Sequence, residues 1–170
     1  MIYTCRYSSP LGEIMLAGHE KALTGLWLEG QKYYAGTLPK SSKEGNTPVF
    51  DIAKKWLDIY FSGREPDFDL PLDLEGSDFR KGVWNILLSI PYGKTMTYKE
   101  IADEMAKKMG LKTMSAQAVG GAVAHNPVSV IVPCHRVVGS DGSLTGYAGG
   151  IEKKIRLLEL EKADGDYSNH

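Results

Sequence analysis

Residues 64–76 (REPDFDLPLDLEG) separate two parts of the chain that differ in their hydrophobic pattern. The segment carries acidic residues and prolines without a helical period, which is typical of a linker. The pattern before it is strand-like, and the pattern after it is mostly helical. A chain of 170 residues has the length of one ordinary domain or of two small lobes. We therefore predict an α+β protein with an N-terminal lobe and linker over residues 1–76 and a C-terminal domain over residues 77–170.

The N-terminal lobe begins with three short runs that predict an antiparallel meander of strands. These runs are Thr4–Ser8, Gly12–Gly18 and Ala22–Glu29. Turn-forming residues separate them, at Ser9-Pro10 and at residues 19–21, so each strand should return beside the preceding one.

The next segment, residues 36–48, is rich in Gly, Ser, Pro and Lys and predicts an exposed loop. A helix follows it, with Thr47 as the N-cap, Pro48 at the first position and Gly63 after the end. Its apolar residues recur at spacings of three and four and form one stripe. They are Phe50, Ile52, Ala53, Trp56, Leu57 and Tyr60.

The C-terminal domain should open with a helix that Ser77 caps and that continues through Ile90. A turn at residues 91–93 (PYG) ends it. Six apolar residues of this helix are predicted to face the core: Phe79, Val83, Trp84, Ile86, Leu87 and Leu88.

Two shorter helices are predicted next. Thr97 caps the first, which ends near Met109, and Glu100 is placed to complete a capping box. A turn around Gly110–Thr113 leads to the second helix, Ser115–Ala124. Two short helices joined by a tight turn after a longer helix form a helix-turn-helix pattern.

The helix Ser115–Ala124 is unusual for its small side chains, and two of them are the adjacent glycines Gly120 and Gly121. Each glycine inside a helix costs about 1 kcal/mol relative to alanine. A close neighbour should offset this cost, and it can be either another helix or the backbone of a nucleic acid. The sequence leaves both interpretations open.

Composition places the chain among soluble globular proteins, with 42% hydrophobic and 24% charged residues. The net charge of −1 conceals an asymmetry: residues 1–76 hold 8 Lys and Arg against 11 Asp and Glu, whereas residues 77–163 hold 12 against 8. The basic second part is compatible with binding a polyanion. No run of apolar residues is long enough to cross a bilayer, and the first residues do not resemble a signal peptide, so we expect a cytoplasmic protein.

Val128–Val132 is a β-branched run that predicts a strand ended by Pro133. This would hold Cys134 on rigid backbone at the end of a strand. A thiol is a good nucleophile only as a thiolate, and its ordinary pKa of about 8.5 leaves little thiolate at neutral pH. His135 and Arg136 offer a base and a positive charge. Because adjacent side chains of an extended segment point to opposite faces, we expect His135 to act through a bridging water.

The Cys134-His135 pair by itself favours an inert, buried cysteine, because cysteine is among the most often buried residue types. A metal site has less support, because no second cluster of ligands has the spacing of a zinc site, and Cys5 and His19 are isolated. A hydrolase that uses a cysteine and a histidine is a further alternative, and it would show turnover.

The residues around Cys134 resemble the signature of a known family, the O6-alkylguanine-DNA alkyltransferases, also called methylated-DNA–protein-cysteine methyltransferases. The resemblance covers most of residues 79–161 and extends more weakly to residues 9–12. It rests on four segments: residues 131–138 (IVPCHRVV), residues 146–150 (GYAGG), residues 118–122 (AVGGA) and Asn126-Pro127. It implies a reactive rather than an inert cysteine. The implied fold has a ribonuclease H-like N-terminal α/β lobe with an antiparallel sheet and a C-terminal winged helix-turn-helix lobe.

The resemblance also implies the roles of the central residues. Cys134 accepts the alkyl group, His135 withdraws the thiol proton through a water, and Glu161 hydrogen-bonds and orients His135. Glu161 falls in a predicted helix over Ile151–Lys162. Asn126 ties the active-site turn to the recognition helix.

Further positions match the pocket that holds the base. Tyr98 matches a tyrosine whose hydroxyl serves the ring nitrogen of the leaving guanine, and Tyr147 with the glycines at 149 and 150 matches the pocket wall. The groups that grip the base edge match three backbone groups: the carbonyls of Cys134 and Val137 and the amide of Ala148.

The implied partner is double-stranded DNA with alkylated bases, which the helix-turn-helix binds in the minor groove beside Gly120 and Gly121. The family commonly has an arginine at the position of Gln117, where it fills the gap left by the extruded base. Glutamine lacks that charge and stacking plane, so we expect weaker duplex binding with intact chemistry. Neither a cofactor nor a metal is predicted, and the protein should act as a monomer.

The implied activity is DNA repair by a single, irreversible transfer of the alkyl group from O6-methylguanine, and also from O4-methylthymine, to Cys134. The alternative from another class is a winged helix-turn-helix DNA-binding protein without catalysis. It explains the charge asymmetry and the helices but not residues 133–138, and non-catalytic relatives replace the cysteine that this chain keeps.

Overall fold

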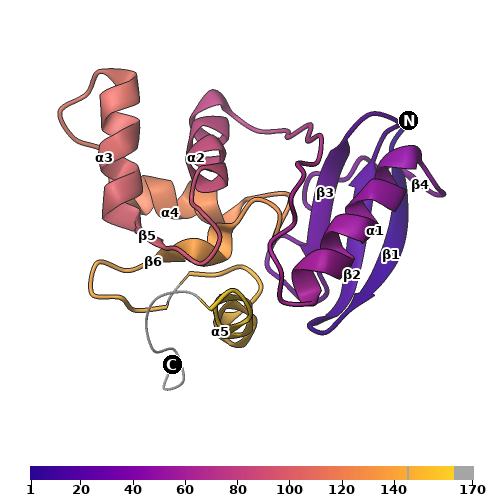
Figure 1. Cartoon of the computed structure of the whole chain (residues 1–170). Helices are drawn as coiled ribbons and strands as arrows, with labels where there is room; N and C mark the ends of the chain where they lie inside the picture. Colours follow the sequence, from indigo (N-terminus) through magenta and orange to yellow (C-terminus); the bar gives the residue numbers. More distant parts are fainter. Residues whose placement is uncertain (145, 163–170) are drawn as a thin grey trace. The chain divides into compact units, whose positions relative to one another are not determined.

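The structure, a computed structural model, describes residues 1–144 and 146–162, and within them it forms two compact units (Figure 1). The last part of the predicted C-terminal domain, residues 163–170, lies outside the described residues. Within the described ranges, every helix is too short or too polar to cross a bilayer.

The two units do not follow a single cut in the chain. The first consists of Met1–Glu75 together with Pro127–Ser129, and the second of Gly76–Asn126 together with the residues from Val130 onward. The predicted division into residues 1–76 and 77–170 therefore omits one feature, a short stretch of the second half that belongs with the first unit.

The first unit is built on a sheet of three antiparallel strands, β1 (Tyr3–Ser9), β2 (Gly12–Gly18) and β3 (Leu23–Leu28). The predicted meander is confirmed, with each strand end within one residue of its expected place. Most side chains of β2 and β3 are buried, which marks these strands as the centre of the unit.

A fourth strand, β4 (Lys43–Glu44), pairs in parallel with the start of β1 and gives the order β3-β2-β1-β4. Residues 36–48, which were predicted to form an exposed loop, therefore contain one short strand, and its pairing with β1 is parallel. Both side chains of β4 are exposed, and two residues are too few to show a period-two pattern.

Helix α1 (Pro48–Phe61) packs against the sheet (Figure 1). The predicted N-cap is confirmed, because the Thr47 side chain accepts a hydrogen bond from the Val49 amide. Ile52, which was expected on the buried stripe, is 42% exposed. Successive residues turn by about 100° around a helix, so Ile52 lies beside the face that its neighbour Ala53 buries.

In the second unit, α2 (Asp78–Leu88) begins at the predicted cap, where the Ser77 side chain accepts from the Arg80 amide. The helix ends two residues before the expected Ile90, because the residue before a proline disfavours helical geometry. Of the six side chains predicted to be inward, four are buried, Phe79 is half-buried and Leu88 is 44% exposed.

The helix-turn-helix consists of α3 (Tyr98–Met109) and α4 (Ala116–Ala124), which pack against each other and against α2 (Figure 1). The capping box of Thr97 and Glu100 is present, and Gly110, with φ of +69°, ends α3 in the left-handed conformation. The Trp84 indole nitrogen donates to the Ala122 carbonyl at 2.8 Å and fastens α4 to α2.

The segment Val128–Val132 is not the predicted strand. Val128 makes an isolated bridge to Leu26 of the first unit, and residues 129–132 turn, with φ of +71° at Val130. Prolines at 127 and 133 bracket the run and lack the amide hydrogens that a ladder needs.

After this turn the second unit continues with a short 3-10 helix, η1 (Cys134–Arg136), and then with β6 (Val137–Val138). β6 pairs in parallel with β5 (Met96–Thr97), which directly precedes α3. The last described helix is α5 (Ile151–Leu160), two residues shorter than predicted, with Glu161 at its C-cap.

The capping box gives a test of the second unit's stability. Thr97→Ala should lower the free energy of unfolding by about 1 kcal/mol, because the Glu100 amide loses the side-chain oxygen that accepts from it at 3.0 Å. Urea denaturation followed by circular dichroism measures the change. Thr113→Ala, at an exposed position outside the helices, is the matched control; equal effects of the two changes would contradict the role of the cap.

Candidate active site

Cys134 is presented by a tight turn rather than by the end of a strand. Pro133 has φ of −81° and ψ of 64°, and the Cys134 amide donates to the Val132 carbonyl at 2.8 Å. These values match an inverse γ-turn, whose central residue lies near about −75° and +65°. The Arg136 amide then donates to the Pro133 carbonyl at 3.0 Å and closes the first turn of η1. The thiol therefore sits on backbone held by consecutive hydrogen bonds.

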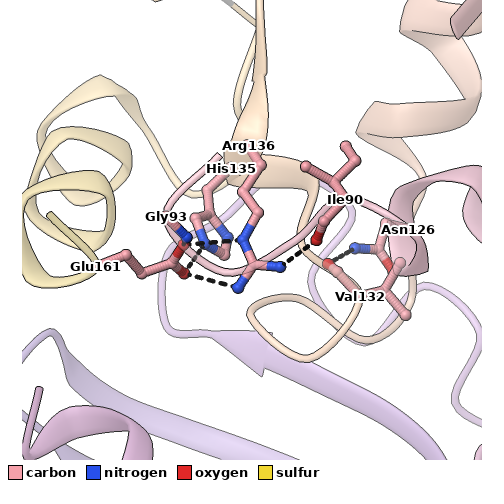
Figure 2. Close-up of polar contacts among 7 residues, drawn as sticks. All are labelled: Ile90, Gly93, Asn126, Val132, His135, Arg136 and Glu161. Atoms are coloured by element: carbon pink, nitrogen blue, oxygen red, sulfur yellow. Dashed lines mark hydrogen bonds and ion pairs between the residues drawn. The ribbon is translucent and has the colours of Figure 1, made fainter. Parts of the chain in front are cut away.

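Asn126 holds this turn to the end of α4. Its side-chain amide donates to the Val132 carbonyl at 2.8 Å, the same oxygen that accepts from Cys134 (Figure 2). Asn126 is 4% exposed, so the bond is shielded from water. The position expected to tie the active-site turn to α4 does make this connection.

His135 and Glu161 form a buried pair. Nε2 of His135 lies 2.6 Å from Oε2 of Glu161, and both side chains are fully buried (Figure 2). Burial lowers the pKa of His135, and the carboxylate of Glu161 opposes this shift. An imidazole in this arrangement offers Nε2–H to the carboxylate, which orients the ring and defines its tautomer.

Arg136 binds the same carboxylate through two nitrogens. Its Nε donates to Oε1 of Glu161 at 2.8 Å and its second terminal nitrogen donates to Oε2 at 3.1 Å. Burial opposes ionisation of Glu161, but its hydrogen bonds to His135 and Arg136 outweigh this and hold the pKa of the carboxyl well below its ordinary value. Glu161 is therefore a carboxylate at neutral pH.

The thiol of Cys134 is protonated in this resting arrangement. It is 3% exposed, and burial raises its pKa, although the Asn126 side chain, the charge of Lys154 and nearby backbone amides oppose the shift. Nucleophilic attack thus requires a base that removes the proton, or an event that exposes the site to an activating group.

Lys154 of α5 is fully buried, and its ammonium group donates to the Val137 carbonyl. Burial lowers its pKa to about 8, against the influence of Cys134. The sequence interpretation missed this residue. Its spacing from Leu157, Leu158 and Glu161 places it on the inward face of the helix, and that periodicity could have revealed it.

Two tyrosines border the cysteine. The hydroxyl of Tyr98, at the start of α3, lies 2.8 Å from the place that a Cβ at Gly146 would occupy, so only glycine lets this loop approach so closely. Burial raises the pKa of Tyr98, as does the nearby Cys134. Tyr147 is 7% exposed, and its hydroxyl makes no hydrogen bond with a described residue. Ala148 follows it and is half-buried.

The exposed face of α4 carries the remaining predicted residues. Gln117 and Gly121 are exposed, and a Cβ at Gly121 would meet open space. Gly120 is half-buried and faces the ring of Tyr98, at 3.9 Å from its own Cβ position. A Cβ at Gly120 would make only an ordinary van der Waals contact, so packing within the described chain requires a glycine at neither position.

Taken together, the second unit places the predicted chemical residues around one turn and the predicted DNA-binding residues on one face of α4. The sequence interpretation offered Arg136 only as a positive charge near Cys134, without its bonds to Glu161. It did not include Lys154 or the backbone groups of Ile90 and Gly93 that bind the network. Across residues 1–144 and 146–162, no three His, Cys, Asp or Glu side chains are grouped closely enough to hold a metal.

Comparison with known proteins agrees with this geometry. A family model described as "6-O-methylguanine DNA methyltransferase, DNA binding domain" matches residues 78–163, and one described as "6-O-methylguanine DNA methyltransferase, ribonuclease-like domain" matches residues 1–74. Methylated-DNA–protein-cysteine methyltransferases of Mycobacterium tuberculosis and Methanosarcina barkeri are 45% and 48% identical. The first alignment covers 96% of this chain and 94% of the relative, the second 91% and 93%.

Solved structures give the same result. OGT of Mycobacterium tuberculosis, crystallised in complex with DNA, superposes with a TM-score of 0.80 at 44% identity, over 95% of this chain and 92% of that one. An O6-methylguanine DNA methyltransferase of Methanococcus jannaschii superposes with a TM-score of 0.63 at 29% identity, over 95% of each chain. The family models span nearly the whole described chain and full-length relatives share over 40% of its residues, so the chain belongs to the 6-O-methylguanine DNA methyltransferase family.

Proposed function

We propose that this protein repairs DNA by moving the methyl group of O6-methylguanine onto its own Cys134. The observation that carries the proposal is the turn of Cys134 beside the buried His135–Glu161 pair, in a chain of this family. In the reaction the bond between O6 and the methyl carbon breaks, and a bond from Sγ of Cys134 to that carbon forms. The products are an unmodified guanine and a thioether.

The proton of the thiol needs an acceptor, because the buried Cys134 is protonated at rest. His135 is suited to this role: its lowered pKa leaves it neutral at physiological pH, and Glu161 occupies Nε2, which directs Nδ1 to the proton. We assign a bridging water to the transfer between Sγ and the ring. The imidazolium that forms is stabilised by Glu161.

The departing guanine gains negative charge at its ring and O6, and it must receive a proton. Tyr98 is the proposed donor to the ring nitrogen, because its hydroxyl lies at the pocket loop near Gly146. Tyr147 would form the wall of the pocket, with the carbonyls of Cys134 and Val137 and the amide of Ala148 on the base edge. The Val137 carbonyl already accepts from Lys154, and its second lone pair stays available.

O6 of a stacked base is out of reach of a buried thiol, so the nucleotide has to leave the helix, at a cost of a few kcal/mol. We assign the contact with the minor groove to the exposed face of α4, where the absence of side chains at Gly120 and Gly121 permits close approach. The relative from Mycobacterium tuberculosis was crystallised in complex with DNA, which supports DNA as the partner. We propose that the protein acts as a monomer, in the cytoplasm.

Transfer should occur once per molecule. A thiolate is a poor leaving group towards water, so the thioether on Cys134 should persist. O4-methylthymine offers the same kind of methyl ether and is a proposed second substrate. A purely DNA-binding role does not explain the arrangement of Cys134, His135 and Glu161. A Cys-His hydrolase would act repeatedly, whereas the proposed transfer consumes the protein.

Mass spectrometry tests the transfer directly. Incubation with duplex DNA that contains O6-methylguanine should add one methyl group per protein molecule, on the tryptic peptide of Cys134. Cys134→Ala should remain unmodified, because it lacks the accepting sulfur. Cys5→Ala is the matched control, since Cys5 is the other free cysteine and lies in the first unit, and it should react like the unaltered protein.

Two outcomes would contradict the proposal. Unaltered protein that gains no methyl group while a known alkyltransferase does so refutes the activity. Repeated release of repaired DNA beyond one equivalent refutes the single turnover.

Gln117 provides a second test, on DNA binding. Gln117→Arg should tighten binding to a methylated duplex by about 1 kcal/mol or more, because a guanidinium can stack in the gap left by the extruded base. Fluorescence anisotropy in a Cys134→Ala background measures the affinity without reaction. Gln117→Lys adds the charge without the stacking plane and should gain less; equal affinities of all three proteins would exclude this role for position 117.

A further inference from the structure

Each of the three guanidinium nitrogens of Arg136 donates a hydrogen bond. Two of its nitrogens hold Glu161, and Nη1 donates to the Ile90 carbonyl at 2.7 Å (Figure 2). Its Cζ lies 5.7 Å from the centre of the Tyr92 ring, within the range of a cation–π contact. Glu161 in turn accepts from the Gly93 amide at 3.3 Å. Arg136 and the Gly93 amide therefore both join the turn after α2 to the end of α5.

The same carboxylate serves two neighbouring residues of η1. One negative charge on Glu161 faces the permanent positive charge of Arg136 and the imidazole of His135. The other ionisable groups that influence this site come from different elements: Lys154 of α5, Cys134 of η1, and Tyr147 of the preceding loop. None of these three groups carries a negative charge at neutral pH, so Glu161 is the anion among the groups named here.

This arrangement has an electrostatic consequence for His135. A carboxylate paired only with a histidine favours the imidazolium, which cannot accept a proton. The charge of Arg136 already neutralises the carboxylate of Glu161. A proton on His135 would add a second positive charge, which Arg136 and Lys154 would both repel. Burial lowers the pKa of His135, and the charges of Arg136 and Lys154 act in the same direction against Glu161.

We propose that Arg136 is a positioning residue for alkyl transfer: it clamps Glu161 in the plane that orients His135 and keeps the imidazole neutral, so that it can take the thiol proton. Arg136 itself neither gives nor takes a proton. The step it supports moves one proton from Sγ of Cys134, through the bridging water, to Nδ1 of His135, while the sulfur's electron pair forms the bond to the methyl carbon and the bond from that carbon to O6 breaks. The inference rests on the proposed transfer to Cys134.

The pH dependence of the transfer rate tests the inference. Single-turnover rates with O6-methylguanine duplex are measured over the pH range in which histidine titrates. Arg136→Gln should shift the acid limb of the rate to higher pH by about one unit, because loss of the cation raises the pKa of His135. Arg136→Lys keeps the charge without the two-pronged contact, so it should slow the transfer with a smaller shift. Arg156→Gln, at an exposed position of α5, is the matched control and should leave the limb in place.

A second background guards against misfolding. Arg136→Gln alone leaves the buried carboxylate of Glu161 with fewer hydrogen-bond donors, which destabilises the fold. The same change in a Glu161→Gln protein avoids this cost, because the carboxylate is absent. The acid limb should shift upward between Glu161→Gln and the double variant as well. NMR titration of the His135 ring in the Cys134→Ala protein should show the same upward shift for Arg136→Gln.

The outcomes separate the inference from the proposed function. A slower rate at every pH with an unmoved acid limb, in both backgrounds, would show a merely structural role and overturn the inference. An unaltered protein that transfers no methyl group would refute the transfer instead, and the NMR titration would still decide whether Arg136 controls His135.

Discussion

The site depends on one buried carboxylate that binds both an arginine and a neutral histidine. Glu161 is 3% exposed, yet it accepts hydrogen bonds from His135, Arg136 and the Gly93 amide. A buried carboxylate without partners would be strongly destabilising, so these donors are a condition for the charge to exist there. Because the donors come from the turn after α2 and from η1, while the acceptor ends α5, the ion pair also defines how these segments meet around Cys134.

The backbone around Cys134 adds the second constraint. The γ-turn at Pro133 and the short η1 helix place Cys134, His135 and Arg136 on consecutive positions of one turn, with Asn126 bonded to its entry. A turn directs neighbouring side chains differently from a strand, in which they would alternate. His135 and Arg136 can therefore both reach Glu161, which two adjacent residues of a straight strand would not do.

Local patterns predicted most of the elements. The caps at Thr47, Ser77 and Thr97 were evident because capping depends on residues within four positions of each other. Predictions were wrong where a local pattern was ambiguous. The β-branched run Val128–Val132 is buried, as the predicted strand would be, but it forms a turn. Prolines flank the run on both sides, and Val128 makes just an isolated bridge to Leu26. The strand β4 was missed because two residues carry no period.

The sequence by itself determined the motif around Cys134 and His135 and its resemblance to the family, because these lie in contiguous segments whose residue types are read directly. Through the family it also indicated the partnership of Glu161 with His135. Only the tertiary structure decided that Arg136 shares that carboxylate, that Lys154 is buried against the Val137 carbonyl, and that Gly121 faces outward. Arg136 and Glu161 are 25 positions apart, and burial and distance between such residues arise from the packing of α5 beside η1, which no local periodicity records.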